Sequence, residues 1–244
     1  MQPNEEKAVA SFFRSEQIEL PMIRRNAFTI ALLVLIAAAM AMAAMAVKRY
    51  PAFLAQPSAR TFLLEPLLVF VLYAVAIKFI VVKMRGANSE IVLRNAALFG
   101  SITGVIEIAN IAIEHGIPFA VQGPALQITV MLLIFAVWGF AGFRTSKVLG
   151  SVSPGILTSV FSAGICMLIA VAAGFAIEFF LAPPRSDYVA TWGEFQRSGW
   201  TDPRAFGIAN ALDSGFSHLV IAPMVAAVFG GVASWLARFK ASRV

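Results

Sequence analysis

Six apolar stretches, each long enough to cross a bilayer as a helix, dominate this chain of 244 residues. A helix needs about 20 mostly apolar residues to span a hydrocarbon core of roughly 30 Å. Only 13% of the residues are charged and 59% are hydrophobic, whereas soluble domains average about 25% and 45–50%. We therefore expect an all-α polytopic membrane protein, a bundle of six transmembrane helices. The six stretches cover residues 27–47, 61–82, 95–115, 124–143, 154–181 and 215–236.

The segments that flank this bundle are short. Residues 1–26 are polar and carry charges of both signs, so we expect a cytoplasmic tail. This tail is either disordered or contains a short interfacial helix that ends before Pro21. Residues 27–239 then form a single membrane domain, and residues 240–244 form a cytoplasmic C-terminal tail. No stretch is left for a separate soluble domain.

The region before the last span contains the longest loop, residues 183–203, which we expect to be external. The helical pattern that follows covers residues 204–239, which is too long for one straight crossing of the core. We therefore predict an interfacial helix or a protruding turn over 204–214 and the sixth span over 215–236. The loop also contains aromatic residues of the kind that favour the headgroup region: Tyr188, Trp192 and Trp200.

The basic residues predict that both termini are cytoplasmic. With the N-terminus inside, twelve Lys and Arg residues fall in cytoplasmic segments and six in external segments. Cytoplasmic segments of membrane proteins carry such an excess of Lys and Arg. The net charge of +6 thus reflects topology, and we expect the lipid bilayer, not nucleic acid, as the partner. Short loops and a first span that is retained favour a bacterial inner membrane.

The third span carries polar side chains on one face. Glu107, Asn110 and Glu114 are spaced i, i+3 and i+7, so a helix places them on one stripe. His115 follows directly. A charged side chain inside a membrane span costs roughly 2.5–3.5 kcal/mol on insertion scales, which makes these carboxylates candidate functional groups.

A second polar group lies at the start of the sixth helical pattern. In the predicted orientation the third span runs outward and the sixth begins outside, so both polar groups fall in the outer half of the bundle. Gln127 and Glu178 also fall at the outer ends of their spans. We therefore expect an outward-facing polar cavity formed chiefly by the third and sixth spans. Its predicted lining residues are Glu107, Asn110, Glu114, His115, Asn210, Asp213, Ser217 and His218.

Other interpretations of these residues remain open at the level of the sequence. The polar groups could form hydrogen bonds between helices or be solvated at helix ends. His115 and His218 could be axial haem ligands, and the mixed His, Glu and Asp set has the right donors for a metal. A single cysteine, Cys166, excludes an intrachain disulfide. Two histidines and that cysteine cannot supply a four-ligand Cys/His zinc site.

Three functional hypotheses follow from these observations. The first is a small proton- or cation-linked transporter, because crowded carboxylates repel one another when ionised and tend to bind protons or cations. The second is a non-catalytic subunit of a larger membrane complex, or a homo-oligomer, that holds lipid, quinone or pigment. The third is a membrane-embedded metalloenzyme that uses Glu107, Glu114, His115 and His218. The sequence contains no H-E-x-x-H, G-x-S-x-G or phosphate-loop motif, so a familiar hydrolase or ATPase mechanism has no support.

Overall fold

The chain folds into helices throughout its described parts. The computed structural model describes residues 3–84, 86–116, 119–183 and 185–241, with side chains over 26–79, 84, 86, 88–115, 124–183 and 185–239. The elements in order are α1 (Pro3–Arg49), the 3-10 helix η1 (Pro51–Ala55), α2 (Ala59–Lys83), α3 (Ala87–Gly116), α4 (Phe119–Leu149), α5 (Val152–Ala176), the π-helix η2 (Ile177–Leu181), α6 (Ser186–Val189), α7 (Gly193–Ser198) and α8 (Pro203–Ala241).

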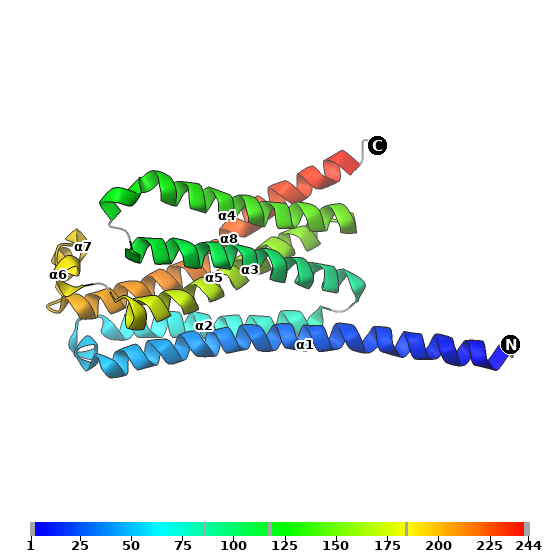
Figure 1. Ribbon diagram of the computed structural model, residues 1–244, viewed down its shortest axis with the longest axis horizontal. Coiled ribbons are helices and arrows are strands. Elements are labelled where there is room, and N and C mark those ends of the chain that lie inside the picture. The colour runs from blue at the N-terminus through cyan, green and yellow to red at the C-terminus, as the bar shows by residue number, and fades with distance from the viewer. Residues whose placement is uncertain (1–2, 85, 117–118, 184, 242–244) are drawn as a thin grey trace.

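Six of the described helices are long and apolar enough to cross a membrane, so the predicted all-α fold with six spans is confirmed. Both termini lie at one end of the bundle in Figure 1, while η1, α6 and α7 lie at the other. We call these the terminal end and the distal end. The side of the membrane that each end faces stays a prediction.

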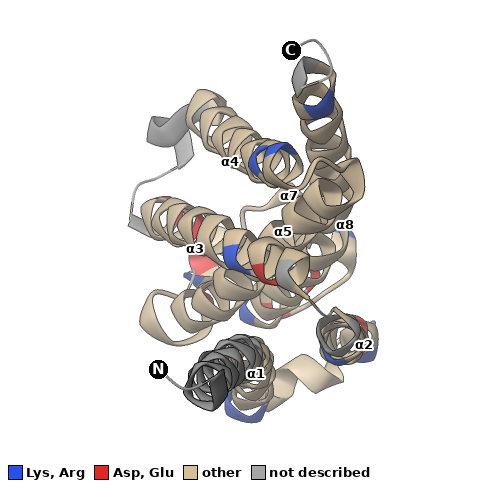
Figure 2. Ribbon diagram, turned by 90° about the vertical axis from the view of Figure 1, so that its right-hand side faces the viewer, with Lys and Arg blue, Asp and Glu red and all other residues tan. Residues whose placement is uncertain are grey.

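Helix α5 is the centre of the bundle. In its most apolar window 56% of the residues are buried, against 22–28% in the other five spans. It packs most extensively against α3 and α8, and α4 packs against α8 and α5. Helices α1 and α2 lie to one side of this four-helix group (Figure 2).

Small residues bring α5 close to its neighbours. A Cβ atom added to Gly100 of α3 would lie 2.7 Å from both the Cβ of Ile165 and the carbonyl oxygen of Ser162. Close approach of backbones at small residues is a common way for membrane helices to associate. The abundance of Gly, Ser and Ala along α5 therefore explains its central place.

The distal end is closed by an aromatic cluster. The ring of Trp200 lies 5.8 Å from Phe53, 5.9 Å from Phe62 and 5.8 Å from Phe206, measured between centroids. Only 7% of Trp200 is exposed, so its predicted place in the headgroup region is wrong, because the ring packs inside the protein. Tyr188 is 48% exposed, and its placement among headgroups stays a prediction.

Two predicted helix ends are also wrong. Helix α1 continues through Pro21, although a proline inside a helix removes one hydrogen bond and clashes with the carbonyl four residues earlier. Helix α8 is continuous from Pro203 to Ala241, without the expected break before Gly215. That glycine packs against α5, since an added Cβ would lie 3.2 Å from the ring of Phe175. A helix of 39 residues is about 58 Å long, and α8 accommodates this by slanting across the bundle (Figure 1).

Candidate functional site

A cavity of about 430 Å³ lies in the distal half of the bundle, between α3, α4, α5 and α8. Three carboxylates, two imidazoles, three amides and a hydroxyl line it, alongside apolar residues from α4 and α5. A volume of this size is within the range of small-molecule sites. The polar lining residues are Glu107, Asn110, Glu114, His115, Gln127, Glu178, Asn210, Ser214 and His218.

The predicted stripe on α3 faces this cavity. Glu107, Asn110, Glu114 and His115 all line it, while Val105, on another face of α3, is 64% exposed. The eight steps along the helix from Glu107 to His115 correspond to a rise of about 12 Å. The α3 side chains therefore extend from the mouth of the cavity near the distal end towards the middle of the membrane.

Glu114 is held from two helices. The Nδ2 group of Asn110 donates to its Oε1 atom at 3.1 Å, and the Nε2 group of Gln127 on α4 donates to the same oxygen at 3.3 Å. The two amide N–H donors stabilise the carboxylate of Glu114 without adding a positive charge. Glu114 thereby links α3 to α4 across the mouth of the cavity.

His115 and Glu178 are in direct contact across the cavity wall. The Nδ1 atom of His115 lies 2.9 Å from the carbonyl oxygen of Ile111, and its Nε2 atom lies 3.1 Å from Oε1 of Glu178. A carbonyl oxygen only accepts, so Nδ1 carries a proton. The Nε2–Oε1 contact then holds one further proton, bound to either atom. The pair is thus a built-in place for one exchangeable proton.

Glu178 is positioned by the π-helix η2, which continues α5 without a break. A π-turn contains a wider i→i+5 repeat and often occurs at functional sites. The altered winding changes the direction in which successive side chains point. It allows the end of α5 to present Glu178 to His115 of α3.

His218 of α8 stands on the opposite wall. Its Nδ1 atom lies 2.7 Å from the carbonyl oxygen of Ser214, so this nitrogen is the donor, and the Oγ of Ser214 lies 3.3 Å away. In a neutral imidazole, Nε2 is then an acceptor that is available to a ligand or a proton.

Two predicted site residues, Asp213 and Ser217, do not line the cavity. The lining face of α8 contains Asn210, Ser214 and His218, at spacings of i, i+4 and i+8. Asp213 is turned away from the middle of this face by roughly 100° at 100° per residue. The cavity was expected to be formed chiefly by the third and sixth spans, but α5 lies between α3 and α8 and builds much of the wall as well.

Glu178 and Gln127 belong to the cavity but were not among its predicted lining residues. Both had been assigned to the outer ends of their spans, where solvation by water is the ordinary explanation of a polar residue. The signal that could have identified Glu178 is its place within an unbroken apolar run, Ile177–Leu181. A carboxylate there requires a partner inside the protein.

The haem and metal interpretations find no support in this geometry. The Nε2 atom of His115 faces Glu178 and is not free to bind iron. Within the described residues, no group of three or more His, Cys, Asp and Glu side chains is arranged to hold a metal ion. The predicted set of Glu107, Glu114, His115 and His218 is therefore not a formed metal site.

The charges that line the cavity favour cations. Three carboxylates face two imidazoles, and one imidazole is already paired with a carboxylate. With His218 neutral, Glu107 and Glu114 remain without a cationic partner within 4 Å among the described residues. Their field attracts protons and small cations.

Comparison of the chain with protein-family models, with characterised proteins and with solved structures finds no match. The geometry of the cavity is therefore the basis on which a function can be proposed for this multi-pass integral membrane protein.

Proposed function

We propose that this protein is a small proton- or cation-linked transporter and that the distal cavity is its binding site. The single observation that supports the proposal is the convergence of three carboxylates and two imidazoles from three helices on one cavity of about 430 Å³. Buried ionisable groups in membrane spans are costly and commonly mark ion or substrate pathways.

The substrate class follows from the lining. A small cation, inorganic or organic, would lie between Glu107 and Glu114, with the side-chain oxygens of Asn110 and Asn210 as further ligands. Apolar side chains such as Met131, Met167 and Phe175 would contact any hydrocarbon part. A free anion of similar size would meet an excess of negative charge.

Proton coupling would use the His115–Glu178 pair. A cation that approaches Glu178 competes for the carboxylate with the imidazolium, so binding of the cation favours release of the shared proton. The titratable groups that face this pair are Glu114 on α3 and, across the cavity, His218 on α8. Rocking of α3 and α4 against α5 and α8 would then change access, as in transporters whose bundles move around a central site.

The test is uptake by purified protein in liposomes. The probes are Na⁺, K⁺ and tetramethylammonium, with a trapped pH dye to detect proton flux. We expect wild-type protein to move at least one of these ions, with uptake that falls as the pH on the cavity side is lowered, because protons compete for the same carboxylates. Glu107→Gln should lower uptake at least roughly tenfold, which corresponds to about 1.4 kcal/mol.

The matched control is Glu65→Gln, which removes a carboxylate from α2, outside the cavity. Its uptake should equal that of the wild type. Equal uptake and equal pH dependence in Glu107→Gln and wild type would exclude the transport proposal, provided that both variants elute as single folded species.

A second candidate function is a non-catalytic subunit that holds a lipid, quinone or pigment. A separate cavity of about 340 Å³ favours it, because its lining from α1, α2, α5 and α8 is almost wholly apolar. The lining includes Phe28, Leu72, Tyr73, Phe161 and Leu219. Organic extraction of the purified protein, visible absorption and co-purifying membrane proteins test this candidate, and ion uptake by the isolated chain would favour the transporter instead.

A further inference from the structure

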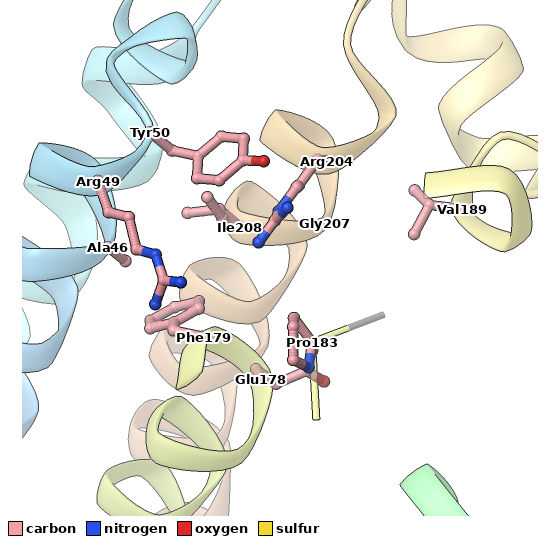
Figure 3. Close-up of a pocket in the computed structure, with 10 residues that line it drawn as sticks. All are labelled: Ala46, Arg49, Tyr50, Glu178, Phe179, Pro183, Val189, Arg204, Gly207 and Ile208. Carbon is pink, nitrogen blue, oxygen red and sulfur yellow. The ribbon is translucent and has the colours of Figure 1, made fainter. Parts of the chain in front are cut away.

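Two arginines meet in a second, smaller pocket at the distal end. The pocket lies between the end of α1, the start of α8, η2 and α6. Arg49 is the last residue of α1 and Arg204 is the second residue of α8, so the two residues are far apart in the sequence. Figure 3 shows both guanidinium groups directed into the same space, with Phe179 below them.

Arg204 is held in place before any ligand binds. Its guanidinium carbon lies 4.1 Å from the centre of the Tyr50 ring, a cation–π geometry that limits the freedom of the side chain. Asp202 begins α8 just before it and accepts hydrogen bonds from the backbone N–H groups of Arg204 and Ala205 at 2.9 and 3.2 Å.

The positive charge in this pocket is not neutralised. Neither the guanidinium group of Arg49 nor that of Arg204 has a carboxylate oxygen within 4 Å among the described residues. Glu178 is the one acid among the residues that line the pocket. Its Oε1 atom already contacts the Nε2 atom of His115 at 3.1 Å. Two guanidinium groups therefore face a space whose single carboxylate already has a partner.

The position of the two arginines along the membrane normal indicates which anions can reach them. Arg49 closes the first membrane span, Asn26–Arg49, and Arg204 lies at the start of the last, Pro203–Phe239. Both are thus at the boundary where lipid headgroups lie. Guanidinium groups bind phosphoryl oxygens in a bidentate manner, and basic pockets between membrane helices bind anionic headgroups.

We propose that Arg49 and Arg204 form a binding site for the phosphoryl group of an anionic phospholipid at the distal membrane surface. The pocket volume of about 20 Å³ is enough for roughly one water-sized group. It therefore admits phosphoryl oxygens, while the rest of the headgroup stays outside. This site is separate from the transport proposal and does not require the chain to move any substrate.

The experiment compares lipid retention and thermal stability in nanodiscs of phosphatidylcholine with and without phosphatidylglycerol. Wild-type protein should retain phosphatidylglycerol through purification, as measured by mass spectrometry, and should unfold at a higher temperature when that lipid is present. The Arg49→Gln/Arg204→Gln double variant should lose both effects, with retention reduced at least about fivefold, or about 1 kcal/mol. Arg204→Lys should give an intermediate result, because it keeps the charge but loses the planar fork.

The control is Arg60→Gln, which removes one exposed positive charge from the start of α2 at the same end. It should retain phosphatidylglycerol like the wild type. Equal retention by the control and by the arginine-pocket variants would overturn the proposal. If the double variant does not fold, the same comparison is made with each single variant.

A further arm distinguishes the source of the phosphoryl group. Millimolar inorganic phosphate in detergent should leave the unfolding temperature unchanged if the ligand is a lipid. Stabilisation by inorganic phosphate without any effect of phosphatidylglycerol would overturn the lipid assignment.

Discussion

At the scale of single residues, one hydrogen bond between α2 and α8 replaces a backbone hydrogen bond that α8 lacks. Pro223 lies inside α8 and has no N–H group, so the carbonyl of Leu219, four residues earlier, loses its usual donor. The hydroxyl of Tyr73 donates to that carbonyl oxygen at 2.6 Å. The surroundings are apolar, and an unpaired carbonyl there is unfavourable. Tyr73 and Pro223 are therefore expected to depend on each other.

We predict that Tyr73→Phe lowers the free energy of unfolding by about 1 kcal/mol, a typical value for such bonds. In a Pro223→Ala background the backbone N–H returns to Leu219, so the same substitution should cost much less. Thermal unfolding in detergent of the four proteins in this double-mutant cycle measures the difference. An equal loss in both backgrounds would show that the hydroxyl does not replace the missing donor. Tyr188→Phe, at an exposed position, is the control for loss of a hydroxyl.

The site residues that could be predicted from the sequence are those fixed by one helix alone. The spacing of Glu107, Asn110 and Glu114 determines a shared face wherever α3 lies, and all three line the cavity. Asp213 lies in a helix, as predicted. Which face of α8 turns inward, however, depends on the packing of α8 against α5, and the sequence of α8 alone does not determine it. The place of Glu178 depends on the π-helix η2, and hydrophobic periodicity does not reveal such a turn.

At the scale of helices, the contact of α4 with α5 and α8 depends on a glycine. A Cβ atom at Gly142 would lie 2.6 Å from the Oγ of Ser159 and 3.1 Å from both the carbonyl oxygen of Gly155 and the Cα of Gly230. Two of these atoms belong to backbone and cannot move away cheaply. One turn earlier, a Cβ at Gly139 would meet its nearest atom, the carbonyl oxygen of Phe229, at 3.7 Å, an ordinary contact.

Gly142→Ala should therefore destabilise the protein by about 1–3 kcal/mol, the usual cost of overpacking a core. Gly139→Ala should be nearly neutral, because the same methyl group finds room on the same helix. Chemical unfolding in mixed micelles or thermal unfolding in detergent separates the two. Since Ala favours a helix more than Gly does, an equal loss in both variants would show that the contact at Gly142 is not the cause.

The extent of the helices could be predicted only where the apolar pattern ends at a clear polar boundary. The first five predicted ranges overlap the apolar helices of the structure, with ends that differ by up to seven residues. The last span differs from its prediction because a length of 39 residues does not require a break: α8 is one slanting helix. Gly215, which has no side chain, leaves space there for Phe175. The central place of α5 depends on small residues on several of its faces, a signal that hydropathy does not contain.

At the scale of the whole molecule, the two ends of the bundle differ in chemistry. The distal half contains the polar cavity and the smaller pocket lined by Arg49 and Arg204. Nearer the terminal end, buried polar residues such as Asn95 and Thr145 form a hydrogen bond with each other at 2.9 Å. A transporter or lipid site that opens at the distal end faces outward only if both termini are cytoplasmic. The excess of basic residues near the termini predicts this orientation.

Thiol labelling tests that orientation with little background, because the single native cysteine, Cys166, is fully buried. Ser186→Cys on α6 places an exposed thiol at the distal end, and Ser153→Cys near the start of α5 places one at the terminal end. A membrane-impermeant maleimide should label Ser186→Cys in intact cells and Ser153→Cys only after lysis, while the wild type should stay unlabelled. The reverse pattern would place the cavity on the cytoplasmic side, so that the proposed substrate would enter it from the cell interior and the headgroup site would select inner-leaflet lipid.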